Sequence, residues 1–482
     1  MRNRSFSAFY PALTLVLLLM TPTLAAAGDS AAPAAMILVA DEEIAALEQA
    51  LMAEVEKNRT RKCMRPVLSG TPLDGPADQK IIDVIEGDVH RTCYEAAKES
   101  FDAIAAYLAA PVGPDNIAPV AVVSACISLP VAMAAAVQHA DACSPYLFGR
   151  RATPELVSTV RGGRALAVLI RHEGASGNWK GAIDMALNGI RFYQDLNRGP
   201  GASLIVAMLS TAAVLSIVNE GLRPLLEAGV PPTAEYQQLL RGVSALLATD
   251  PPFCDSLAYE RYGLALQTLL PTIKGKGWEP PGGFDYGVSP EESPAEMGRL
   301  GVAPGQEMAL VWIAMDGVHE QFAQMCRTNN RVAGLHADMR AAAEKVIARP
   351  KQSNWRRILG LLGAKEPKVV LRNWIVEILQ AIALPALDKY VVRYAQRRFT
   401  LQGLRLQLLV ANYSVANGVC PSLKGLEHPG FASATVDPGS GKPMVITFPE
   451  NGILKLAPAQ ETIDAVGDAE MVGFYQFSCP IK

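Results

Sequence analysis

Residues 154–197 read PELVSTVRGGRALAVLIRHEGASGNWKGAIDMALNGIRFYQDLN. On either side of Gly177-Asn178, apolar residues recur at intervals of three and four, which is typical of a helix with one buried face. The glycine-containing break predicts a turn. The stretch therefore predicts two antiparallel helices, over 154–174 and 178–197, joined as a hairpin.

The same spacing continues through most of the chain, in a composition dominated by Ala, Leu, Glu, Gln and Arg. Further helices are predicted over 41–60, 77–109, 117–140, 201–228, 233–249, 254–272, 305–347 and 368–416. Half of the 482 residues are apolar and 19% are charged, which excludes a disordered chain. The predicted fold class is mainly α, with stacked, irregular helical hairpins.

Two predicted helical segments carry no charge over long stretches, 117–138 and 201–218. Both are rich in Ala, Ser and Thr, and the first contains Pro119 and Pro130. This composition favours helices that are buried at the centre of a large helical protein. A membrane span at 201–218 is the alternative, and the sequence does not decide between the two.

The first 27 residues have the organisation of a secretory signal peptide. Arg2 and Arg4 precede an apolar run over 11–20, and the three alanines at 25–27 match a cleavage site. We therefore predict an exported protein, periplasmic or extracellular, whose mature chain begins near residue 28. Its 42 basic and 47 acidic residues would give a net charge of −5, which makes it a poor candidate for binding nucleic acid.

All eight cysteines lie in the predicted mature chain, and an even number in an exported protein favours disulfides. They are Cys63, Cys93, Cys126, Cys143, Cys254, Cys326, Cys420 and Cys479. The sequence does not fix their pairing. Short loops favour Cys63–Cys93 and Cys126–Cys143, while Cys254–Cys326 would close a long loop and Cys420–Cys479 would hold the tail. No C-x-x-C pair is present, and we predict no metal and no cofactor.

Two segments depart from the helical pattern. Residues 274–304 are rich in Gly and Pro and predict either a linker or a loop that covers a binding site. Beyond residue 416, prolines recur between apolar runs at 444–448, 452–456 and 472–477, which are typical of short strands. The predicted organisation is a signal peptide (1–27), a helical domain (28–273), a linker (274–304), a helical segment (305–416) and a small β-rich tail (417–482).

Two resemblances follow from these residues. The junction Gly177-Asn178-Trp179-Lys180-Gly181-Ala182, with Ala186, resembles the corner between helices in tetratricopeptide-type repeats, although no regular repeat recurs. Tyr413, Gly418, 421–423, Leu426 and 437–443 are similar to the globular part of type II secretion pseudopilins. Together they resemble a class of exported bacterial helical proteins, and the resemblance implies no activity. Because the processing site and the calcium loop of pilins are incomplete here, we predict neither a pilin subunit nor a calcium protein.

Several catalytic patterns are incomplete. The runs 171–173 and 319–320 begin like a zinc-protease motif, but Ser176 and Ala323 stand where the second histidine is needed. The run 439–442 resembles a phosphate loop without its first glycine and its final hydroxyl residue. The sequence therefore favours a protein without enzymatic activity and assigns no catalytic residue.

Positive charge is concentrated between residues 349 and 405, where twelve basic residues face three acidic ones. This basic block carries +9, so the rest of the mature chain carries −14. Three interpretations are open: pairing with the acidic remainder of the chain, a solvated face, or contact with an anionic surface such as lipid head groups or a polyanionic glycan. The residues that would make such a contact are Arg356, Arg357, Lys389, Arg393 and Arg397, the last three forming a stripe with a four-residue spacing.

These observations favour an exported helical scaffold or interaction protein, whose partner is another envelope protein or a cell-envelope component. Two alternatives remain open. One is an exported hydrolase with its site near 274–304, and the other is attachment to an anionic membrane surface through the basic block.

Overall fold

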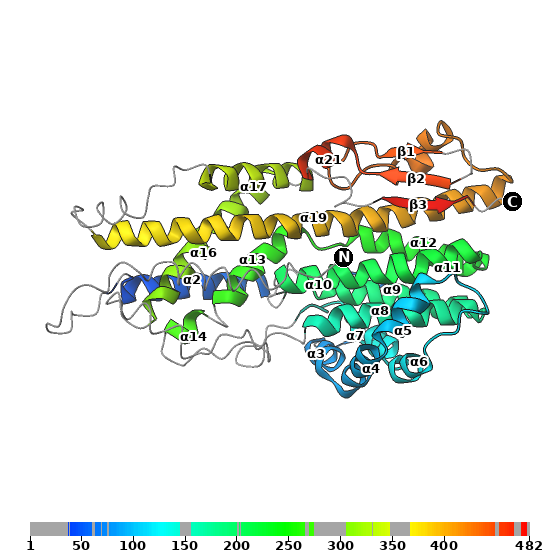
Figure 1. The fold of residues 1–482 in the computed structure, drawn as a ribbon, viewed down its shortest axis with the longest axis horizontal. Coiled ribbons are helices and arrows are strands. Elements are labelled where there is room, and N and C mark those ends of the chain that lie inside the picture. Colours follow the sequence, from blue (N-terminus) through cyan, green and yellow to red (C-terminus); the bar gives the residue numbers. More distant parts are fainter. Residues whose placement is uncertain are drawn as a thin grey trace.

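The computed structural model describes residues 37, 39–59, 63–68, 70–74, 77–144, 156–199, 202, 204–265, 269–273, 305–329, 331–347, 367–448, 453–466 and 474–479. The chain is mainly helical, with one small antiparallel sheet near its C-terminal end (Figure 1). The predicted fold class is confirmed. The predicted signal peptide (1–27) and the Gly/Pro-rich segment 274–304 lie outside the described residues.

The predicted hairpin is formed by α8 (Leu156–Ala175) and α9 (Trp179–Asp195). The Tyr193 hydroxyl of α9 donates to the Thr159 carbonyl of α8, so the two helices run antiparallel along their whole length. At the corner Gly177 has φ +87°, a conformation that favours glycine, and the Asn178 side chain accepts from the Gly181 N–H at 3.1 Å. The turn residues therefore end one helix and begin the next.

Four long predicted helices are interrupted, one of them being 305–347, whose helical structure stops at Thr328 and resumes at Val332. The segment 77–109 forms α3 (Asp78–Glu86), α4 (Asp88–Glu99) and α5 (Phe101–Ala109), while 117–140 forms α6 (Val120–Cys126) and α7 (Leu129–Val137). The segment 201–228 forms α10 (Leu204–Leu215), the π-helix η1 (Ser216–Leu222) and α11 (Arg223–Ala228). One break falls at Gly87 and others lie near Pro130 and Pro224, because these residues weaken a continuous helical hydrogen-bond ladder. The break between α4 and α5 falls at Ser100.

Arg171 compensates for one of these breaks. Pro224 lacks the N–H that would pair with the Glu220 carbonyl four residues earlier, and Arg171 Nε donates to that carbonyl. The other guanidinium nitrogens of Arg171 donate to the Tyr107, Leu108 and Ala110 carbonyls at the end of α5. Arg171 is 2% exposed, so one buried side chain joins α5, α8 and η1.

The remaining helices include a single element that runs the length of the molecule. They are α2 (Asp41–Arg59), α12 (Thr233–Ala248), α13 (Phe253–Leu264), α14 (Leu270–Ile273), α16 (Gln306–Thr328), α17 (Val332–Ile347) and α19 (Pro367–Asn417). With 51 residues, α19 is about 75 Å long. It lies between the sheet and α17 on one side and α10, α12 and α13 on the other (Figure 1).

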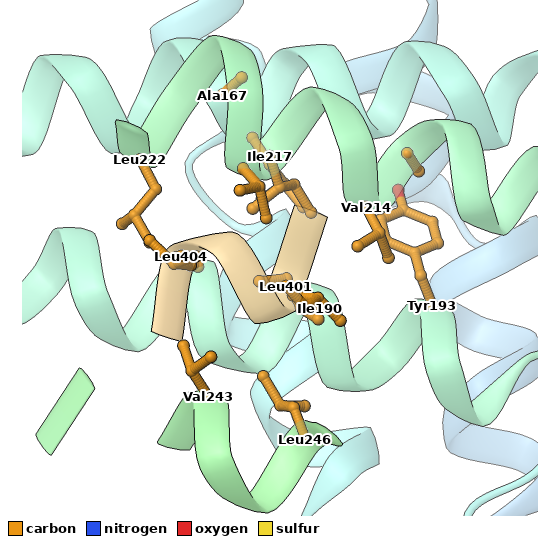
Figure 2. Close-up of a cluster of buried hydrophobic side chains, with 14 of the residues drawn as sticks. Ala167, Ile190, Tyr193, Val214, Ile217, Leu222, Val243, Leu246, Leu401 and Leu404 are labelled. Carbon is orange, nitrogen blue, oxygen red and sulfur yellow. The ribbon is translucent and has the colours of Figure 1, made fainter. Parts of the chain in front are cut away.

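The largest buried cluster forms where α19 meets the hairpin helices. Leu401 and Leu404 of α19 lie among Ile190 of α9, Ile217 of η1 and Val243 of α12 (Figure 2). A second, smaller cluster packs α2 against α13, α14 and α16, with Trp312 and Tyr259 among its buried aromatic residues. The body is therefore held together mainly by helix-on-helix burial of apolar side chains.

The tail contains the three predicted strands, β1 (Val445–Thr447), β2 (Ile453–Ala457) and β3 (Tyr475–Ser478), in the order β1-β2-β3. Short helices accompany them: η4 (Gly425–Glu427), α20 (Pro429–Ala432) and α21 (Gln460–Val466). The Tyr475 ring packs where Gly403 leaves room on α19, and its hydroxyl donates to Gln407 Oε1 at 2.6 Å. The tail thus shares the core of the helical body.

Four disulfides connect the elements: Cys63–Cys143, Cys93–Cys126, Cys254–Cys326 and Cys420–Cys479. The pairings of Cys254 with Cys326 and of Cys420 with Cys479 are confirmed. The predicted pairs Cys63–Cys93 and Cys126–Cys143 are wrong, because α4 packs against α6 and so brings Cys93 to Cys126. Loop length changes the closure entropy only slowly, and packing therefore decides the pairing. Four disulfides are suited to an oxidising environment.

Two described stretches, Val120–Val137 and Val206–Ala228, are long and apolar enough to cross a membrane, a test that the core helices of soluble proteins also pass. The second stretch begins within α10, which packs against α8, α9 and α19. Its Thr211 hydroxyl accepts from Arg397 Nη1 at 3.4 Å. These contacts support the interpretation of 201–218 as a buried helix.

Candidate functional site

Two buried aspartates organise a cluster of arginines between α9, α12 and α19. The first, Asp195 at the end of α9, accepts from Arg65 through both carboxylate oxygens, with Nε at 3.0 Å from Oδ1. Arg198 adds an Nε–Oδ1 distance of 3.3 Å. The Cys63–Cys143 disulfide lies beside this pair. Next to it, the Arg65 N–H donates to the Ala140 carbonyl and the Ser144 N–H donates to the Asp195 carbonyl, so the backbone on both sides of the disulfide is held in place.

The second aspartate, Asp250, follows α12. Its Oδ1 accepts from Arg397 Nη2 at 2.8 Å and from Gln194 Nε2 at 2.9 Å, and Arg398 Nε lies 3.6 Å from Oδ2. The neighbouring Thr249 hydroxyl accepts from Arg191 Nη1 at 2.7 Å. Both Asp250 and Arg397 are almost completely buried.

Positive charge exceeds negative charge in this arginine cluster, which we define as Arg65, Arg191, Arg198, Arg397 and Arg398 with Asp195 and Asp250. Five arginines against two aspartates give a formal charge of +3. Burial lowers the pKa of Arg191 to about 10, so the group stays charged at neutral pH. Burial raises the pKa of Asp195 and contact with Arg65 opposes that rise. Buried charge that is not balanced by a partner is costly.

A pocket adjoins this cluster between α9, α10, α13 and α19. It has about 290 Å³ of space, part of it open to solvent. Its polar lining comprises Asn197, Thr211, Ser256, Tyr390, Arg393, Tyr394 and Arg397. Asn197 is 1% exposed and neither its Nδ2 nor its Oδ1 has a hydrogen-bond partner, and Arg397 Nε also has none. Two buried groups of this lining, the Asn197 side-chain amide and Arg397 Nε, therefore have hydrogen-bonding capacity that is unused.

The residues predicted to contact an anionic surface have different positions. Arg356 and Arg357 lie outside the described residues, and so does the side chain of Lys389 in α19. Arg393 is exposed, as the stripe requires. Arg397 is only 1% exposed and pairs with Asp250, so its predicted place on a surface stripe is wrong. The reason is that Arg397 lies on the side of α19 that faces α10 and Asp250.

Several described arginines of the basic block pair with acids from other parts of the chain. Arg372 Nη1 lies 3.0 Å from Glu43 Oε2 of α2, in addition to the Asp250 contacts of Arg397 and Arg398. For these residues the structure supports pairing with the acidic remainder of the chain.

Neither incomplete catalytic pattern acquires its missing groups. Among the described residues no group of three or more His, Cys, Asp or Glu is placed to hold a metal ion. In the run 439–442, the backbone N–H groups of Gly439 and Ser440 donate to the Asp437 carboxylate at 3.1 and 3.2 Å. Those donors are therefore occupied by the chain itself, where a phosphate loop would leave them for its ligand. The hydrolase alternative depends on 274–304, outside the described residues.

A second feature is a set of exposed apolar side chains on α6 and α7 and directly beside them, which we call the α6–α7 face. Ile117, Val120, Ile127 and Val131 are 80%, 74%, 52% and 70% exposed. Consecutive members are three, seven and four positions apart, and no charged residue lies between positions 117 and 138. An uncharged apolar patch of this kind marks an interaction surface more often than a solvated one.

The two aspartates, Asn197 and three of the arginines in the cluster were not predicted from the sequence. One signal was present: Arg191 and Asp195 stand four residues apart in a helix whose other residues are largely apolar or small. Charges on the buried face of a helix need partners from elsewhere. Arg65, the partner of Asp195, lies 130 positions away from it in the sequence, and Asp250, the partner of Gln194, lies 56 positions away. The sequence alone does not show that these residues meet.

In comparisons with known proteins, no family model matches this chain, and no curated protein or solved structure is significantly similar to it. The resemblances to tetratricopeptide-type repeats and to pseudopilin tails therefore stay predictions.

Proposed function

We propose that the protein is an exported, non-enzymatic interaction protein of the cell envelope, periplasmic or extracellular, that docks a partner protein on its α6–α7 face. The observation that carries this proposal is the exposure of Ile117, Val120 and Val131 in a stretch without charge. Burial of such side chains against a partner would contribute about 25 cal/mol for each Å² removed from water.

The way in which α6 and α7 are fixed to the rest of the protein supports the proposal. The Cys93–Cys126 disulfide fixes α6 to α4, and α7 packs against α3 and α9. Its inward residues, among them Val122, Leu129 and Met133, are buried. A face held rigidly before binding loses less conformational entropy when a partner docks.

The partner we propose is an envelope protein that offers an apolar helical face. The exposed residues are three, seven and four positions apart along α6, α7 and their flanks, and apolar side chains of this kind can pack against a helix of the partner. Export is supported by the signal-peptide pattern of residues 1–27 and by four disulfides.

The test places a photo-crosslinking residue at Val120 in the full chain and identifies the adducts formed in envelope extracts. We expect one predominant protein adduct that disappears in a Val131→Glu variant, because a buried carboxylate opposes docking. The matched control is Val230→Glu, a similar change at a 51% exposed valine between α11 and α12, which should leave the adduct unchanged. Adducts only to lipid, only to a second copy of the chain, or equally in both variants would contradict the proposal.

A further inference from the structure

We propose that the pocket between α9, α10, α13 and α19 is a binding site for a small oxyanion, such as a phosphate, a sulfate or a carboxylate. This inference is independent of the α6–α7 face, which contributes no residue to the pocket. It rests on charge balance, on unused donors and on access from solvent.

The charge argument starts from the +3 of the arginine cluster. Asp195 is already engaged by Arg65 and Arg198, and Asp250 by Arg397 and Arg398. The fifth arginine, Arg191, is 1% exposed; its Nη1 donates to the neutral Thr249 hydroxyl, while Asp195 and Asp250 act on it as neighbouring charges that raise its pKa against the effect of burial. A bound anion would supply negative charge that the described residues of the cluster lack, and inside a protein such compensation is worth more than in water.

The donor argument concerns the pocket wall. Arg397 is part of both the cluster and the wall, and its Nε–H has no acceptor. Asn197 brings an amide Nδ2 without a partner, although it is 1% exposed. Thr211 and Ser256 add hydroxyl groups from α10 and α13. An oxyanion has several acceptor oxygens, so it can accept hydrogen bonds from donors on four different elements at once. A monatomic anion such as chloride has a single acceptor atom.

A third argument comes from the end of α13. Pro251 and Phe253 line the pocket at the N-terminal end of this 12-residue helix, where the helix dipole favours negative charge and where Asp255 of the first turn already supplies one carboxylate. Arg393, exposed on α19, lines the open side. It would meet an entering anion before Arg397 does. Met208, Pro251 and Phe253 form the apolar part of the pocket wall.

Arg393→Gln tests the site without disturbing the buried pairs, because Arg393 is exposed and its described contact is a hydrogen bond to Gln396. Calorimetric titration of the oxidised full-length mature protein would compare sodium phosphate, sulfate and acetate with sodium chloride at equal ionic strength. We expect saturable binding of one or more oxyanions, and binding at least about tenfold weaker in Arg393→Gln. The preferred anion distinguishes a tetrahedral from a carboxylate ligand.

The matched control is Arg91→Gln, which removes the same charge from an exposed position on α4, where Arg91 pairs only with Asp88 among described residues. Its oxyanion affinity should equal that of the unchanged protein. Equal weakening in both variants would show general charge attraction and overturn the proposal. So would titrations in which no oxyanion binds better than chloride.

Asn197→Asp provides a second test that does not depend on ligand choice. The side chains have the same shape, and the aspartate would place a permanent carboxylate in the pocket. If the cluster lacks an anion, this variant should melt at a higher temperature than the unchanged protein when both are in chloride. Adding an oxyanion should then no longer raise its melting temperature, as it does for the unchanged protein. A lower melting temperature with oxyanion stabilisation retained would contradict the inference, because it would mean that the pocket has no need of negative charge.

Discussion

At the scale of single residues, buried arginines act as connectors. Arg171 donates to four backbone carbonyls from α5 and η1, which an apolar side chain or a lysine cannot do. The planar fork of the guanidinium group matches several acceptors at fixed angles, whereas an ammonium group is a compact point charge. The fold therefore depends on the shape of this side chain as well as its charge.

We expect Arg171→Lys to lower the free energy of unfolding by roughly 2–5 kcal/mol, because it leaves buried carbonyls without donors. Urea denaturation followed by circular dichroism would measure the loss. Arg241→Lys is the control, since Arg241 is exposed on α12, and its effect should stay within about 0.5 kcal/mol. An equal effect of the two substitutions would show that the carbonyl contacts contribute little.

His90 makes the stability dependent on pH. Burial lowers its pKa from 6.5 to about 4, and its Nε2 has no hydrogen-bond partner. The unfolded chain therefore binds a proton below pH 6.5 that the folded chain does not accept until about pH 4. This stabilisation is complete above pH 6.5 and is lost as the pH falls towards 4, by about 3 kcal/mol at most.

The pH prediction is checked by unfolding free energies measured at pH 7 and pH 5. The decrease between them should be smaller in His90→Phe, which keeps a ring beside Tyr94 and cannot titrate. His172→Gln, at an exposed position, should retain the full decrease. A decrease unchanged in His90→Phe would assign the pH dependence to other groups.

At the scale of elements, close helix packing is set by glycine. A Cβ added at Gly163 of α8 would lie 2.5 Å from the Ala213 Cα and 2.7 Å from its Cβ on α10. Since one of these atoms belongs to the backbone, the helices must move apart to admit even a methyl group. Gly163 thus determines the separation of α8 and α10.

We expect Gly163→Ala to destabilise the protein by about 1–3 kcal/mol through overpacking, in spite of the better helix propensity of alanine. Gly113→Ala is the control, because nothing lies within 4 Å of the added Cβ, and it should be neutral or slightly stabilising. Thermal unfolding of the two variants gives the comparison. Stabilisation by Gly163→Ala would mean that α8 and α10 separate easily.

Elements were predictable from the sequence wherever a local pattern determines them. The hairpin of α8 and α9 follows from apolar spacing and from Gly177-Asn178, and the strands of the tail follow from short apolar runs. Interruptions such as η1 were missed because proline position and a distant arginine act together there. The candidate pocket could not be predicted either, because Asn197 and Arg397 are far apart in the sequence and line the same pocket only in the folded protein.

At the scale of the whole molecule, long-range links hold helices that are distant in sequence. Cys254–Cys326 joins α13 to α16 across a separation of 72 residues that includes the Gly/Pro-rich segment. Arg261 strengthens the same region by pairing with Glu54 of α2 at 3.0 Å and with Asp316 of α16. The buried cluster around Trp312 depends on these links.

We expect the double variant Cys254→Ser/Cys326→Ser to lose about 2–4 kcal/mol of stability, because its unfolded chain gains conformational freedom. The shift of the guanidinium midpoint measures this loss, with the other three disulfides kept oxidised. A loss much below about 1 kcal/mol would show that the unfolded chain keeps α13 near α16 without the bond.

The connectivity of the first two disulfides has a consequence for the order in which they form. The Cys93–Cys126 bond lies inside the loop closed by Cys63–Cys143. If the chain is exported as proposed above and crosses the membrane with its N-terminus first, Cys63 and Cys93 arrive together before either of their final partners. Oxidation of neighbouring thiols as they arrive would give Cys63–Cys93, which the folded protein does not contain. The native bonds then require exchange between thiolates and disulfides, so the yield of folded protein should depend on a catalyst of that exchange.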